Sequence, residues 1–203
     1  GDVCSAAVSN GREIIAEKSI QEKNSHSTYL ASYVDEVLKK SGYQINELDA
    51  VVIGGGPGSY TGLRIGCSLA KGLCFGADLP LIACSTLYAQ AAEALRKYPE
   101  ADRLITLIDA RRMDAYLGVF DKELNALVDE QFITIDEQLS VDYVQGKTIA
   151  CGSGAAKWMD EFPLKNVLYH RFSGIYANNL LAEALIKWAK KEVVDLAYYE
   201  PNY

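Results

Sequence analysis

Short blocks of apolar residues, separated by polar and glycine-containing stretches, recur along the chain with two different spacings. Apolar positions in residues 3–9 and 13–20 indicate two strands, and the intervening Asn10-Gly11 favours a type I′ hairpin turn. Residues 28–40 have the spacing of an amphipathic helix, which Gly42 can terminate in the left-handed conformation. The apolar positions of this helix are Leu30, Val34, Val37 and Leu38.

The remaining pattern predicts alternating strands and helices up to the end of the chain. In the first half we expect strands at 50–53 and 80–84 and helices at 63–75 and 86–97. In the second half we expect strands at 104–108, 115–120, 127–133, 148–151 and 167–169, and helices at 136–144, up to about 161, and 175–191.

The element order of the first half is repeated in the second, except that the first half has no opening strand. We therefore predict an α/β protein with a duplicated actin-like ATPase (ribonuclease H-like) fold, in which each of two lobes has a mixed sheet flanked by helices. The expected lobes are 1–98 and 99–203, with the last helix packing back on the first lobe, and a further strand is expected immediately before Gly1. Two unrelated α/β units are the alternative.

Composition limits the classes of function. The net charge of −7, from 20 basic and 27 acidic side chains, argues against independent binding to nucleic acid. No apolar run approaches the roughly 18–20 residues that span a bilayer, and the N-terminus does not resemble a signal peptide, so we expect no membrane association and a cytoplasmic protein. The five cysteines are odd in number and lie in apolar stretches, which predicts reduced core thiols.

A glycine-rich loop joins the strand at 50–53 to the following helix. A loop of this kind at a helix N-terminus can bind an anion, but no Lys-Ser/Thr pair follows Gly62, and Thr61 stands where the dinucleotide fingerprint requires Gly. Two interpretations stay open: the glycines permit close backbone packing, or the loop contacts a nucleotide or partner. Arg64 can likewise pair with an acidic neighbour or clamp a phosphate. The loop residues are Gly54, Gly55, Gly56, Pro57, Gly58, Ser59, Thr61 and Gly62.

No set of catalytic or metal-ligating residues emerges from the pattern. Leu30 stands four residues after His26, where a helical metal pair would need a second imidazole. Asp109 and Asp114 follow a strand, where an actin-like ATPase would hold magnesium through water, but Arg111 and Arg112 make an ion-paired turn at least as plausible. We therefore expect no catalytic residue, no metal and no cofactor.

Residues 51–66, VVIGGGPGSYTGLRIG, closely resemble the TsaB (YeaZ) family. The resemblance extends along nearly the whole chain, although the family's opening strand is absent and Gly152-Ser153-Gly154 has serine where an acidic residue is frequent. The other matching segments are Asp2-Val3-Cys4-Ser5, His26-Ser27, residues 109–116 and Glu200-Pro201-Asn202-Tyr203.

This resemblance implies a role in the threonylcarbamoyl modification of the adenosine beside the tRNA anticodon. It implies a non-catalytic partner of the TsaD-type transferase and, through it, of the TsaE-type ATPase, with a homodimer as a further possibility. The family docks its partner through the helices at about 28–40 and 61–75. The expected contact residues are Tyr29, Tyr33, Tyr60, Leu63 and Arg64. The alternative function is an active ATPase or kinase of the actin-like superfamily.

Overall fold

A computed structural model describes residues 3–23, 25–172 and 174–203, so Asp2 of the first matching segment lies outside the described residues. Contacts divide the chain into two compact units. Unit 1 contains residues 1–86 and 174–203, and unit 2 contains residues 87–173. The chain thus divides at 86/87, twelve residues before the boundary expected at Tyr98, and the C-terminal helix belongs to the first unit.

Unit 1 contains two separate two-stranded sheets. Strands β1 (Val3–Asn10) and β2 (Glu13–Gln21) are antiparallel, whereas β3 (Val51–Gly56) and β4 (Leu81–Ser85) are parallel. The helical elements of this unit are α1 (His26–Ser41), the short 3-10 helices η1 (Ile45–Glu47) and η2 (Ala177–Leu180), α2 (Tyr60–Ala77) and α6 (Leu181–Ala189).

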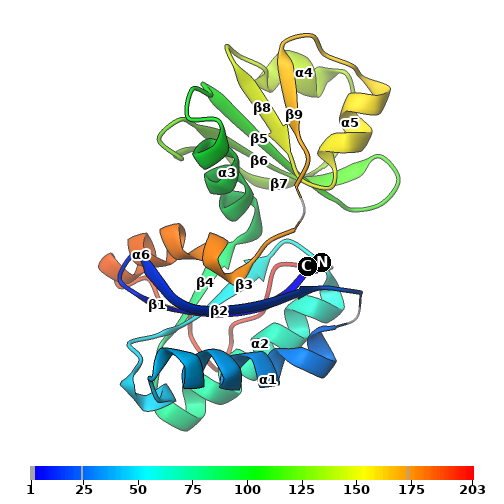
Figure 1. Ribbon diagram of the computed structural model, residues 1–203. Helices are drawn as coiled ribbons and strands as arrows, with labels where there is room; N and C mark the ends of the chain where they lie inside the picture. The colour runs from blue at the N-terminus through cyan, green and yellow to red at the C-terminus, as the bar shows by residue number, and fades with distance from the viewer. Residues whose placement is uncertain (1–2, 24, 173) are drawn as a thin grey trace. The chain divides into compact units, whose positions relative to one another are not determined.

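Helices α1 and α2 lie on one side of these strands, and η2 and α6 lie on the other (Figure 1). Tyr33 and Val37 of α1 pack with Cys4 and Val8 of β1. The buried face of α2 packs on β3 and β4 through residues at helical spacing, namely Cys67, Ala70 and Cys74. The η2 segment contacts both β1 and β3 and so connects the two sheets. Among the described residues, no strand pairing joins these sheets.

Unit 2 is built on one five-stranded mixed sheet with the order β7-β6-β5-β8-β9. The central strand β5 pairs antiparallel with β6 and parallel with β8. The strands are β5 (Arg103–Asp109), β6 (Asp114–Asp121), β7 (Ala126–Thr134), β8 (Thr148–Cys151) and β9 (Val167–His170). The helices are α3 (Thr86–Lys97), α4 (Gln138–Tyr143) and α5 (Ala155–Glu161).

Apolar side chains cover both faces of the unit 2 sheet. Leu107 and Trp158, from β5 and α5, belong to the core on one face, and Leu104 and Leu87, from β5 and α3, belong to the core on the other. All four are fully buried. Burial of each such side chain stabilises the fold by about 1.5–3 kcal/mol, which makes β5 the strand most strongly fixed by packing.

The structure confirms the predicted α/β class and, in unit 2, the mixed sheet flanked by helices, whereas the described strands of unit 1 form two separate pairs and not one mixed sheet. Three local corrections follow. Asn10 pairs with Glu13, so Gly11-Arg12 forms the centre of the hairpin turn, and the turn is not type I′ because Gly11 has φ 56° but Arg12 does not have positive φ. Strand β3 continues through three glycines to Gly56, and α2 begins at Tyr60. The predicted helix 175–191 is shorter, because η2 precedes an α-helix of only residues 181–189.

The strand expected before Gly1 stays a prediction. No helix among the described residues is long and apolar enough to cross a membrane.

Candidate functional site

The glycine loop lies between β3 and α2, and its own C-terminal neighbours shape it. Ser59 is the N-cap of α2, and its hydroxyl accepts a hydrogen bond from the Gly62 N–H at 3.5 Å. Leu63, on the first turn of the helix, packs back towards Gly56 and Gly58. The loop is therefore a strand-to-helix junction held by one cap and one apolar side chain.

The C-terminal segment 199–203 packs directly against the loop backbone. The Asn202 N–H donates a hydrogen bond to the Gly55 carbonyl at 2.8 Å. A Cβ atom on Gly56 would overlap the Asn202 carbonyl, and one on Gly55 would lie 2.5 Å from the Tyr199 hydroxyl. Gly56 also has φ 103°, a conformation that side chains rarely permit. Of the two interpretations left open by the sequence, close backbone packing accounts for these two glycines.

Aromatic contacts extend this packing onto the start of α2. The ring of Tyr203 lies 4.5 Å from that of Tyr60, and the Arg64 guanidinium lies 5.1 Å from the Tyr60 ring and donates to its hydroxyl. Burial raises the pKa of Tyr199 to about 12, so this phenol is protonated at neutral pH. Arg64 thus interacts with an aromatic ring, and it forms no ion pair with an acidic neighbour among the described residues.

The five expected contact residues separate into different environments. Tyr33 is only 7% exposed and belongs to the unit 1 core, which corrects its expected place on a partner-facing surface. Tyr29 is half-buried and stacks on Tyr33 at 5.7 Å, and Leu63 is half-buried over the glycine loop. Tyr60 and Arg64 are exposed at the start of α2.

One face of α2 forms an exposed stripe whose members are spaced three or four residues apart. We call it the α2 stripe, and it consists of Thr61, Arg64, Ser68, Gly72 and Phe75. Phe75 is 85% exposed, and a Cβ atom on Gly72 would meet no atom within 4 Å. The sequence contained a signal for this face, because Phe75 is out of phase with the buried Cys67, Ala70 and Cys74, but the prediction did not include it.

The turn between β5 and β6, residues 109–114, is held by a lysine from α5. The Lys157 ammonium lies 2.5 Å from Asp109 Oδ1, 2.9 Å from the Arg112 carbonyl and 2.5 Å from the Asp114 carbonyl. The turn is ion-paired, as suggested, but its cation comes from Lys157. Among the described residues, neither Arg111 nor Arg112 forms an ion pair.

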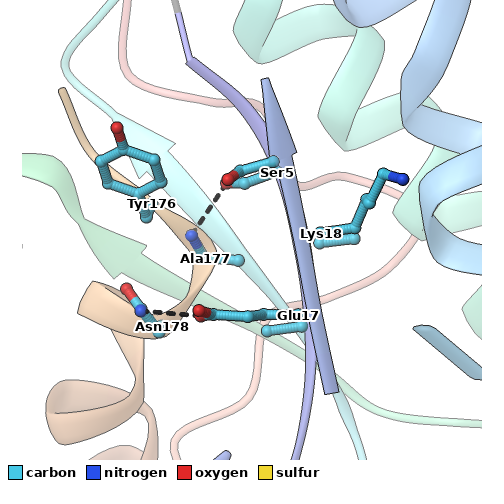
Figure 2. Close-up of a pocket in the computed structure, with 9 residues that line it drawn as sticks. Ser5, Glu17, Lys18, Tyr176, Ala177 and Asn178 are labelled. Carbon is cyan, nitrogen blue, oxygen red and sulfur yellow. Dashed lines mark hydrogen bonds between the residues drawn. The ribbon is translucent and has the colours of Figure 1, made fainter. Parts of the chain in front are cut away.

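A small hollow lies between the β1–β2 hairpin and residues 176–178 (Figure 2). The Ala177 N–H donates to Ser5 Oγ at 2.9 Å, and the Asn178 side-chain amide donates to Glu17 at 2.9 Å. Figure 2 shows Lys18 directed away from these groups, and its ammonium pairs with Glu36 at 3.0 Å. Glu17 is thus hydrogen-bonded to an amide and Lys18 is ion-paired elsewhere, so these contacts connect η2 to the hairpin and the hollow offers little to a charged ligand.

The histidines and cysteines occupy buried or half-buried positions. Burial lowers the pKa of His26, which lies beside Gly62 of the loop, and burial together with Lys97 lowers the pKa of His170. All five cysteines are free and buried, which confirms the predicted core thiols. No group of three or more potential ligands among the described His, Cys, Asp and Glu residues is arranged to hold a metal ion.

Comparisons with known proteins agree along the whole chain. The family model for TsaD, tRNA N6-adenosine threonylcarbamoyltransferase, matches residues 13–202. The tRNA threonylcarbamoyladenosine biosynthesis protein TsaB of Escherichia coli is 31% identical, with 100% of this chain and 90% of that protein covered. The protein of the same name from Haemophilus influenzae is 30% identical over 89% of this chain and 80% of that protein.

Solved structures also match the chain over its whole length. YeaZ from Pseudomonas aeruginosa superposes with a TM-score of 0.87 at 26% identity, covering 100% of this chain and 94% of that one. A second crystal structure, of an uncharacterized protein with similarity to peptidase YEAZ from the same organism, has a TM-score of 0.88 at the same identity and coverage.

Proposed function

Because the chain belongs to the TsaB (YeaZ) family, we propose that it is a non-catalytic subunit in tRNA threonylcarbamoyladenosine biosynthesis. In this proposal it binds a TsaD-type catalytic subunit and, through that subunit, a TsaE-type ATPase. The α2 stripe is the docking surface. The observation that carries the proposal is that this stripe is exposed and that most of its residues are uncharged.

The composition of the α2 stripe suits a protein partner. Phe75 is an aromatic anchor, and the open space above Gly72 allows a second backbone to approach closely. Arg64 is the only charged member of the stripe, in a chain with 47 charged side chains. Protein interfaces are depleted of charge at their centre and enriched in aromatic residues and arginine, which is the composition found here.

Helix α1 differs from α2 on its exposed face. That face is polar and includes the Lys39–Asp35 ion pair, with 2.6 Å between the two charged atoms. Exposed ion pairs of this kind contribute about 0.3–0.5 kcal/mol to helix stability and are well solvated. Of the two helices implied by the resemblance, α2 therefore has the exposed face whose burial by a partner contributes more binding free energy.

An ATPase or kinase of the same fold is the alternative. Two observations speak against it: the C-terminal segment packs on Gly55 and Gly56, and the Asp109 carboxylate pairs with Lys157. Calorimetric titration with ATP and magnesium tests this alternative, and tight binding to the isolated protein would favour it.

The docking proposal is tested with Gly72→Arg, assayed by co-elution with a purified TsaD-type subunit and by tRNA modification. Arginine is a good helix former and meets open space at this position, so the variant is expected to fold. We expect at least about tenfold weaker binding, because a long cation blocks close approach at the centre of the stripe.

The matched control is Asn166→Arg, which adds the same side chain at an exposed turn of unit 2. It should bind like the wild type. Unchanged binding by Gly72→Arg would exclude the α2 stripe, and failure of the wild type to bind or to increase modification would exclude the proposed function itself.

A further inference from the structure

We propose that the turn at residues 109–114 is a cation-binding cradle in which the Lys157 ammonium is the permanently bound cation. The proposal concerns unit 2 alone and does not depend on partner binding. It assigns to Lys157 the position that a soluble cation would otherwise take at the end of β5.

Three oxygen atoms converge on the Lys157 Nζ. They are Asp109 Oδ1 and the backbone carbonyls of Arg112 and Asp114, all within 2.9 Å. An ammonium has three N–H donors and no acceptor, so each donor has one oxygen and none is left unpaired. One carboxylate and two carbonyls are also the type of ligand that hard cations prefer.

Asp109 and Asp114, at the two ends of the turn, are also held by hydrogen bonds that do not involve the lysine. The Asp109 N–H donates to Ser153 Oγ at 3.0 Å, and Asp109 Oδ1 accepts the Arg111 N–H at 3.0 Å. The Asp114 carboxylate accepts a hydrogen bond from the Thr134 hydroxyl at 2.8 Å. Both ends of the turn are therefore fixed by contacts that are independent of Lys157.

The backbone within the turn has an unusual conformation at two successive residues. Arg111 and Arg112 have φ of 75° and 46°, in the left-handed region that non-glycine residues seldom adopt. Their side chains are exposed, whereas the Lys157 side chain is only 20% exposed. The guanidinium groups of the turn are thus exposed to solvent, while a lysine from another element supplies the cation that pairs with Asp109.

The cradle is tested with Lys157→Ala, which empties it, and with small cations that refill it. At constant ionic strength, Lys157→Ala should melt several degrees below the wild type, because the carbonyls and the carboxylate lose their common donor. Methylammonium chloride should raise the melting temperature of this variant and not that of the wild type. Tetramethylammonium chloride has the same charge without N–H donors, so it should have no such effect.

The control variant is Lys165→Ala, at an exposed position of the same unit, which should melt within about one degree of the wild type. Equal effects of methylammonium and tetramethylammonium on Lys157→Ala would overturn the proposal. So would a Lys157→Ala variant that melts with the wild type.

If Lys157→Ala does not fold, the wild type supplies the measurement. Nitrogen-15 spectra of the lysine ammonium groups should show Lys157 with slowed hydrogen exchange, because all three donors are bonded and largely covered. An exchange rate equal to that of the exposed Lys165 would overturn the proposal.

Discussion

The two units share an order of elements but differ in how their strands are connected. Unit 2 places β5 in the middle of five paired strands, with packed cores on both faces. In unit 1, β1–β2 and β3–β4 are separate sheets, and side chains of α1, α2 and η2 connect them. The comparison shows that helix packing can hold two strand pairs in one unit without a continuous backbone ladder among the described residues.

The difference also concerns the size of the residues that fill the sheets. The central strand β5 buries Leu104, Ile105 and Leu107 completely. Strand β1 buries Cys4, Ala6 and Val8, which are smaller and stabilise less by burial. Because helix side chains hold the two sheets of unit 1 together, the backbone amides of β1 should be less protected from hydrogen exchange than those of β5.

Hydrogen exchange tests this difference between β1 and β5, and we expect a larger effect here than in the mutational tests below. The amides of β1 that point away from β2 have no strand partner among the described residues, whereas β5 is paired on both edges. We expect the β5 amides to exchange over a hundredfold more slowly, a difference of roughly 3 kcal/mol in opening free energy.

The measurement is residue-resolved exchange by NMR, and the β1 amides that point towards β2 are the internal control. Equal protection of both sets in β1 would contradict the expectation. That result would indicate that a further strand covers β1, as the repeated element order predicts.

Alanine substitution at two glycines of unit 1 tests the close packing at the glycine loop. Gly56→Ala should lower the free energy of unfolding by about 2–3 kcal/mol, because its Cβ would overlap the Asn202 carbonyl and its φ is 103°. Gly66→Ala, in α2 with open space around its Cβ, should raise stability by about 0.5–1 kcal/mol.

Urea unfolding measures both changes, and carboxypeptidase digestion of folded protein reports whether residues 199–203 have been released. A Gly56→Ala variant as stable as Gly66→Ala, with an equally protected C-terminal segment, would contradict the close packing described here.

Buried thiols compare the units directly, since Cys84 lies in unit 1 and Cys151 in unit 2. Burial raises the pKa of each thiol from 9.0 to about 12. The unfolded chain therefore loses these protons first as the pH rises, and stability should fall between about pH 9 and 12, by about 1 kcal/mol per pH unit for each thiol.

Urea unfolding at several alkaline pH values under reducing conditions measures this slope. Cys84→Ala and Cys151→Ala should each remove a similar share of it if the units unfold together, and the double variant should remove both shares. A slope unchanged in the double variant would contradict the assignment to these thiols.

Much of the fold was predictable because the apolar spacing is regular. The α3 helix has the predicted bounds, and Cys67 and Cys74 are buried, as expected for thiols in apolar stretches. The shortened C-terminal helix was not predictable, because the apolar spacing continues through residues 177–180 while the backbone there forms a 3-10 turn that contacts β1 and β3. Contacts distant in sequence decided that element.

The candidate site was less predictable for the same reason. The glycines showed that something approaches the loop closely, but only the structure identifies Tyr199 and Asn202, more than 140 residues away in the chain. Tyr33 has helical neighbours that suit either a core or a surface, and packing against β1 places it in the core. Lys157 carries no local signal for its contacts with the turn at 109–114.

The buried cysteines have a practical consequence for following assembly. All five lie among the described residues, and with their sulfurs covered they should react slowly with maleimide dyes in the native protein. A single cysteine introduced at the exposed Ser68 would then accept one fluorophore without removal of the native thiols. The emission of this fluorophore would report whether the middle of α2 is exposed to solvent or covered when another subunit is added.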